Sequence, residues 1–103
     1  MPWSAELQQL RDQLVDCLIA RCREEVGDRK SITRTTDPDR DLGIAEEDLD
    51  DVQIEAAACL GLRPPYPGEP LIVPWHGPGQ RLTLEDIAAW LAVNGRPLAD
   101  GDR

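Results

Sequence analysis

A chain of 103 residues has the size of one domain with one small hydrophobic core. Its 41% hydrophobic and 30% charged residues are typical of a globular protein in water, and no apolar run reaches the length of a membrane helix. The net charge of −9 opposes binding to nucleic acid and to anionic membranes. It favours a basic protein partner, although surplus charge also simply keeps a small domain in solution.

The segment MPWSAELQQL lacks the charged and apolar regions of a signal peptide, so we expect a cytoplasmic protein. We also expect it to be a monomer. The three cysteines, Cys17, Cys22 and Cys59, are odd in number and show no metal-binding spacing. We expect reduced thiols that are buried among aliphatic side chains.

The first predicted element is a long amphipathic helix that begins after Ser4 and ends near Val26 and Gly27. Ser4 is a suitable N-cap, and Gly27 can adopt the left-handed conformation that closes helices. The apolar residues recur every three or four positions, at Leu7, Leu10, Leu14, Cys17 or Leu18, and Cys22. The polar residues 28–40 are predicted to form a loop.

A second amphipathic helix is predicted to start with Asp48 as its N-cap and to end at Gly61. Its inward residues by spacing are Leu49, Val52, Ala56, Cys59 and Leu60. Glu46, Glu47 and Asp48 lie at its start, where the positive end of the helix dipole favours negative charge.

Residues 63–80 contain six prolines and three glycines, a composition that excludes a helix and a central strand. We expect an ordered loop that lies across the helices. Thr83 then caps a last helix, which ends at Asn94 and Gly95. Its inward residues are predicted to be Leu84, Ile87 and Leu91, which turns Trp90 toward the flank.

These elements predict an all-α fold, a small bundle of three to four helices with a long Pro-rich loop before the last helix. The chain is expected to be a single domain over residues 1–103, with its core in about 5–93. The polar residues 96–103 are expected to fray.

Two motifs give the chain a resemblance to a known family. Asp41, Leu42 and Gly43 form an Asp-Leu-Gly motif, and residues 48–54 read DLDDVQI at the start of an amphipathic helix. This combination resembles the acyl carrier proteins, in which an Asp-Leu-Gly loop is followed by a Ser-Leu-Asp-x-Val-Glu-Leu run. The resemblance implies an acyl-carrier-like bundle.

Two departures from the family pattern bear on function. The gap formed by residues 44–47 is two residues longer than in the usual carriers, and Asp48 stands at the position of the carrier serine. That serine carries phosphopantetheine, which a carboxylate cannot hold in a stable linkage. Ser4 and Ser31, the only serines, do not precede an LDxV-type helix, so we expect no cofactor.

The resemblance leaves recognition as the function that could persist. Carrier proteins present acidic residues of the second helix and its preceding loop to basic patches on enzymes. The partner-binding residues implied for this chain are Asp41, Glu46, Glu47, Asp48, Asp50, Asp51 and Glu55, with Asp37 and Asp39 just before them. The alternative is a solvated acidic loop beside a favourable helix N-terminus.

Catalytic and metal chemistry have little support in the sequence. The run DPDRDLGIAEED breaks the calcium-loop pattern, since its sixth residue is Leu42 rather than Gly. His76 has no nucleophile placed beside it by a local signature, and no Gly-rich phosphate loop is present. We therefore expect a protein that is not an enzyme and holds no metal.

An alternative resemblance is to the colicin-type immunity proteins, which inhibit nuclease toxins. The run IAAWLAVNGRP is similar to that family's final helix with its Trp-x-x-x-Asn-Gly ending. The family's tyrosine-rich helix is missing, because Tyr66 is the only tyrosine. The two resemblances imply different partners, either a basic patch on an enzyme or a basic toxin nuclease.

Overall fold

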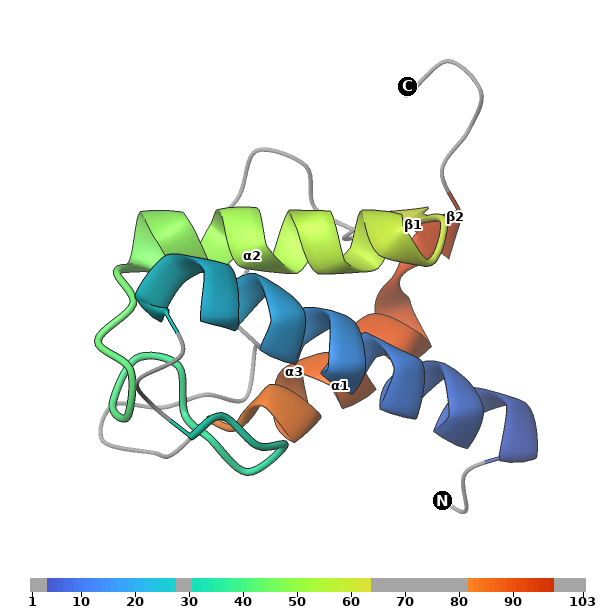
Figure 1. Cartoon of the computed structure of the whole chain (residues 1–103). Coiled ribbons are helices and arrows are strands. Elements are labelled where there is room, and N and C mark those ends of the chain that lie inside the picture. Colours follow the sequence, from blue (N-terminus) through green and yellow to red (C-terminus); the bar gives the residue numbers. More distant parts are fainter. Residues whose placement is uncertain (1–3, 28–30, 64–81, 98–103) are drawn as a thin grey trace.

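Three helices and a two-stranded sheet make up the part of the chain that the computed structural model describes, residues 4–27, 31–63 and 82–97 (Figure 1). The helices are α1 (Ala5–Val26), α2 (Glu46–Cys59) and α3 (Leu84–Asn94). Strands β1 (Leu62–Arg63) and β2 (Arg96–Pro97) pair antiparallel, with Leu62 opposite Pro97 and Arg63 opposite Arg96. The predicted all-α class is confirmed. None of the described helices is both long enough and apolar enough to cross a membrane.

Helix α1 begins and ends where the sequence predicts. The Ser4 side chain accepts a hydrogen bond from the amide of Leu7 at 3.1 Å, which satisfies one of the free donors of the first turn. Gly27 ends the helix with φ 81°, a conformation that strains other residues, and its amide donates to the carbonyl of Arg23 at 2.8 Å. Leu14, Leu18 and Cys22 are fully buried.

The predicted N-cap of α2 is wrong, because the N-cap is Ala45, three residues before Asp48. Ala45 occupies the N-cap position with extended backbone and no side-chain hydrogen bond. Asp48 is the third helical residue, still within the first turn, where the helix dipole favours negative charge. Glu46 and Glu47, which precede the DLDDVQI run, are the first two residues of the helix.

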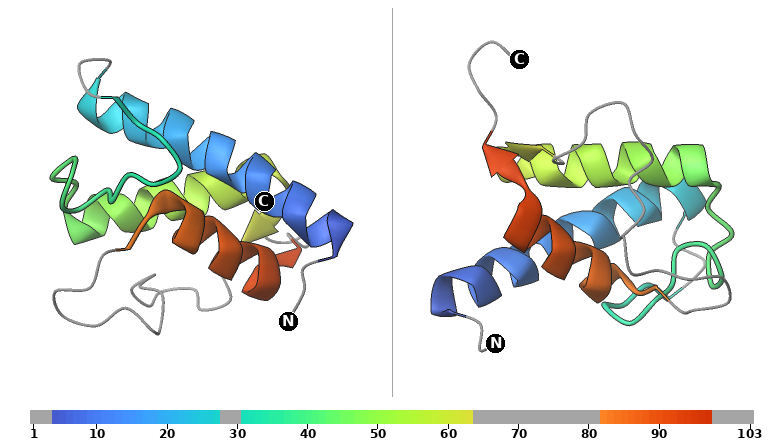
Figure 2. Two further views of the ribbon diagram at one scale, coloured as in Figure 1. Left: turned by 90° about the horizontal axis from the view of Figure 1, so that it is seen from below. Right: turned by 180° about the vertical axis from the view of Figure 1, so that it is seen from behind.

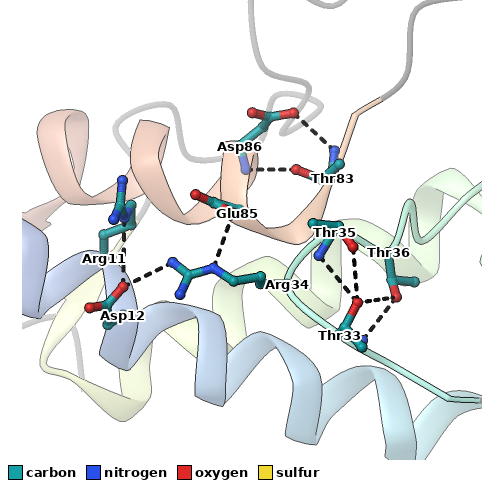
Figure 3. Close-up of polar contacts among 9 residues, drawn as sticks. All are labelled: Arg11, Asp12, Thr33, Arg34, Thr35, Thr36, Thr83, Glu85 and Asp86. Atoms are coloured by element: carbon teal, nitrogen blue, oxygen red, sulfur yellow. Dashed lines mark hydrogen bonds and ion pairs between the residues drawn. The ribbon is translucent and has the colours of Figure 1, made fainter.

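Helix α3 has both of its predicted caps. Thr83 and Asp86 form a reciprocal capping box, in which each side chain accepts from the other's backbone amide at 3.1 to 3.2 Å (Figure 3). Gly95 lies at the C-terminal end, and its amide donates to the carbonyl of Leu91 at 2.7 Å. The three inward residues Leu84, Ile87 and Leu91 are fully buried, as predicted.

The core forms around α1, which packs against both α2 and α3 (Figure 2). Buried aliphatic residues of the connecting segment extend this core, namely Ile32, Leu42 and Ile44. Trp90, expected on the flank of α3, is buried within it. Burial of each large aliphatic side chain stabilises the fold by roughly 1.5 to 3 kcal/mol, so the small core still contributes strongly.

The start of the predicted Pro-rich loop pairs with the start of the predicted C-terminal tail. Arg63, the first residue of the predicted loop, lies in β1, and Arg96 and Pro97, the first residues of the predicted frayed tail, form β2. The rest of the loop and of the tail lies outside the described residues, as do His76 and Tyr66.

Candidate functional site

The acidic segment that leads into α2 contains a short helical turn with its own caps. Asp37 is the N-cap of this turn, because its Oδ1 accepts from the amides of Asp39 and Arg40, both at 3.0 Å. Pro38 follows at the first position, where its fixed φ is favourable. Gly43 closes the turn with φ 70°, and its amide donates to the carbonyl of Asp39 at 2.9 Å. The Asp-Leu-Gly motif thus has a structural reason for its glycine.

Asp37 also attaches this turn to the start of α3. Asp37 is only 2% exposed, and its Oδ2 accepts from the amide of Leu82 at 3.0 Å. The neighbouring carbonyls of Thr36 and Arg34 accept from the first amides of α3, those of Leu84 and Glu85, both at 2.9 Å. Asp37 is therefore a structural residue and does not belong to the acidic surface with which the sequence grouped it.

A cation fixes the same segment to both flanking helices (Figure 3). Arg34 donates from Nη2 to Asp12 of α1 at 2.9 Å and from Nε to Glu85 of α3 at 3.0 Å. The hydrogen bond to Asp12, together with the charge of Glu85, raises the pKa of Arg34. Arg34 thus places its charge against carboxylates of α1 and α3.

Helix α2 presents one acidic face to solvent. Four of the predicted partner-binding residues are exposed on it, namely Glu47, Asp48, Asp51 and Glu55. Asp50 is half-buried, and Asp41 in the preceding turn is exposed but accepts from the amide of Asp37 at 2.9 Å. The side chain of Glu46 lies outside the described part of the chain.

The exposed carboxylates of this face differ in their ion pairs within the described residues. Glu55 lies 3.8 Å from the guanidinium of Arg21 on α1, which also contacts Glu24 at 3.2 Å. In residues 4–27, 31–63 and 82–97, no cation forms an ion pair with Glu47, Asp48 or Asp51. This concentration of negative charge repels itself, and a nearby positive surface would relieve the repulsion.

An apolar side chain lies within the acidic face. Ile54 is 48% exposed, one helical turn after Asp51 and Asp50 and two turns after Glu47. Sequence reasoning placed Ile54 at a position where the carrier family has leucine and did not identify it as a surface residue. Ile54 thus gives the acidic face one exposed apolar side chain.

The opposite face of α2 carries a polar residue that periodicity did not identify. Gln53 is only 1% exposed, and neither its Oε1 nor its Nε2 has a hydrogen-bond partner within the described ranges. Val52 and Ala56 are buried beside it, as predicted. Burying an unpaired amide costs about 1 to 3 kcal/mol, so Gln53 lowers the stability of the fold.

The structure contradicts the prediction for one cysteine and agrees with the expectation for both serines. Cys59, expected to point inward and to be buried, is exposed, while Cys17 is half-buried and Cys22 is buried. Ser4 caps α1, and Ser31 is exposed in the segment that follows α1, so neither lies at the start of α2.

Metal ligands do not gather in the described residues, where no cluster of three or more histidine, cysteine or acidic side chains could hold an ion. What the fold and this site define is a small all-α protein with one exposed acidic helix. No family model, no curated protein and no solved structure matches the chain.

Proposed function

We propose that this chain is a non-catalytic, acyl-carrier-like protein that acts in the cytoplasm as an acidic docking or regulatory protein for a partner enzyme with a basic patch. The observation that carries this proposal is the exposed face of α2, on which Glu47, Asp51 and Glu55 accompany the 48% exposed Ile54. Binding through such a face would combine long-range electrostatic attraction with burial of one apolar side chain.

Asp48 supports a docking function over carriage of an acyl group. It lies exposed in the first turn of α2, at the position where the resemblance to carriers expects serine. A carboxylate there adds to the acidic face, whereas it offers no hydroxyl for a phosphodiester. The proposal therefore needs no cofactor, and the protein acts as a monomer.

Charge reversal on α2 tests the proposal. Glu47→Lys with Asp51→Lys places two cations on the exposed face, both at sites without an ion-pair partner in the described structure. A matched control is Glu6→Lys with Glu25→Lys, since these residues are exposed on α1 and the change in net charge is the same. Glu6, like Glu47, lies in the first turn of its helix, so both variants lose one favourable dipole interaction.

The readout is a pull-down from the host lysate at low and moderate salt, with the captured proteins identified by mass spectrometry. We expect the wild type and the α1 control to retain the same basic enzyme, with weaker retention at higher salt. The α2 variant should bind it at least about tenfold more weakly. Ile54→Ala should also weaken capture of the enzyme, although it leaves the net charge of the protein unchanged.

Equal retention of the captured enzyme by the wild type and both charge variants would refute the docking face. Retention of a basic nuclease toxin would instead favour the immunity-type alternative. The Asn-Gly ending behind that alternative has a local role as well, because Asn94 donates from Nδ2 to the carbonyl of Trp90 at 3.0 Å.

A further inference from the structure

Two cysteine side chains meet across the contact between α1 and α2. The helices run antiparallel (Figure 1), and Arg21 of α1 reaches Glu55 of α2 at 3.8 Å. One helical turn before Arg21 lies Cys17, and one turn after Glu55 lies Cys59. The same antiparallel register therefore brings these cysteines together, and after burial the Cys59 side chain is the next cause that raises the pKa of Cys17.

The three cysteines differ in their access to solvent, and this difference selects one pair. Cys59 is exposed, Cys17 is half-buried, and Cys22 is buried in the core of α1. An external oxidant can therefore reach Cys59 first, and Cys17 is the thiol beside it. A solvent-accessible cysteine can form a mixed disulfide, which a second thiol beside it can then resolve.

We propose that Cys17 and Cys59 are a redox modification site that forms a reversible disulfide between α1 and α2 on reaction with a small-molecule disulfide of the oxidised glutathione class. The Cys59 thiol loses its proton to solvent, and its sulfur attacks the external disulfide, which releases one small thiol and leaves a mixed disulfide. Cys17 then loses its proton and attacks the Cys59 sulfur, which releases the second small thiol. The protein loses two electrons and two protons, and the external disulfide is reduced to two thiols.

The surroundings of Cys17 set the pace of the second step. In the reduced protein, burial and then the hydrogen bond with Cys59 raise the pKa of Cys17 to about 11. Burial, the largest of these causes, persists when Cys59 is in the mixed disulfide. Because the thiolate is the attacking species, closure is slow at neutral pH and accelerates as the pH rises. The rate of closure should increase about tenfold per pH unit between about pH 7 and 9, as long as attack by Cys17 limits the rate.

Peptide mapping identifies the pair directly. The full chain is reduced, freed of reductant, and incubated with oxidised glutathione, after which the remaining thiols are alkylated. Trypsin places Cys17 in residues 12–21, Cys22 in residues 22–23, and Cys59 in residues 41–81, since cleavage before Pro64 is poor. We expect loss of two hydrogens from the intact mass, a cross-link between residues 12–21 and 41–81, and its removal by dithiothreitol.

Variants give a second, independent readout. Cys22→Ala should retain the cross-link, because Cys22 is not part of the pair, whereas Cys17→Ser and Cys59→Ser should each abolish it. A stable glutathione adduct on Cys59 without closure, a cross-link that includes Cys22, or thiols that stay fully reduced would each overturn the proposal. The experiment needs no partner protein, so its outcome is independent of the docking function proposed above.

Discussion

Replacement of Asp37 tests the idea that the acidic segment is held by a buried carboxylate. Its two oxygens accept three backbone hydrogen bonds, from the amides of Asp39, Arg40 and Leu82, each at 3.0 Å. Asp37→Ala removes all three. Loss of the N-cap costs about 0.5 to 2 kcal/mol, and the unsatisfied Leu82 amide costs about a further 1 to 3 kcal/mol.

The expected decrease in the free energy of unfolding is about 2 to 4 kcal/mol, a large fraction of the roughly 5 to 15 kcal/mol that stabilises a typical domain. Asp37→Asn should lie between this variant and the wild type. Its amide oxygen can still accept from Asp39 and Arg40, but its nitrogen cannot accept from Leu82. Urea unfolding, followed by far-ultraviolet circular dichroism and by tryptophan fluorescence, measures the three stabilities.

Asp39→Ala is the matched control, because it removes an exposed carboxylate from the same turn while leaving its backbone amide in place. We expect it to change stability by less than about 0.5 kcal/mol. If Asp37→Ala were as stable as Asp39→Ala, the buried carboxylate would not be what holds the turn to α3.

Further predictions concern the carrier position, a crowded glycine and the proposed disulfide. Incubation with a phosphopantetheinyl transferase and coenzyme A should leave the intact mass unchanged, because Asp48 has no hydroxyl; a gain of phosphopantetheine mass would contradict this. Gly95→Ala should lower stability in urea by about 1 to 3 kcal/mol, because the new Cβ would lie 2.5 Å from the carbonyl oxygen of Leu91. That carbonyl already accepts from the Gly95 amide, so the backbone cannot move away freely. An unchanged urea midpoint would show that the backbone does move to accommodate the Cβ. The oxidised protein should unfold at a higher urea concentration than the reduced one, because the disulfide raises the free energy of unfolding by about 3 to 4 kcal/mol. Cys59→Ser should have the same urea midpoint under both conditions.

Local chemistry explains which parts of the fold could be predicted from the sequence. The three helices, the caps at Ser4 and Thr83, and the end of α1 at Gly27 depend on residues within one turn of each other. The start of α2 has no such local signal, because Ala45 supplies no capping side chain. Asp48 fits the N-cap preference better, and the prediction therefore chose it. Strands β1 and β2 are two residues each, too short for any alternation, and they exist because the chain brings them together.

The candidate site divides in the same way. Exposure of Glu47, Asp48 and Asp51 follows from the period of the helix and could be predicted. Burial of Asp37 could not, because one of its donors, the Leu82 amide, lies 45 residues away. The exposure of Ile54 and the burial of Gln53 reverse their ordinary hydropathy, and only the packing of α2 determines them.

The acidic segment divides its carboxylates between two tasks, and this division explains how so much negative charge can be held at one place. The carboxylates of Asp37 and Asp41 accept hydrogen bonds from backbone amides, so their charges are compensated within the fold. Glu47 and Asp48 have no ion-pair partner among the described residues, and the dipole of α2 stabilises each by a few tenths to about 1 kcal/mol. A basic partner would gain its binding energy from this second group without removing the hydrogen bonds that hold the turn. Charge reversal at Glu47 and Asp51 should therefore affect binding much more than folding, whereas changes at Asp37 should affect folding first.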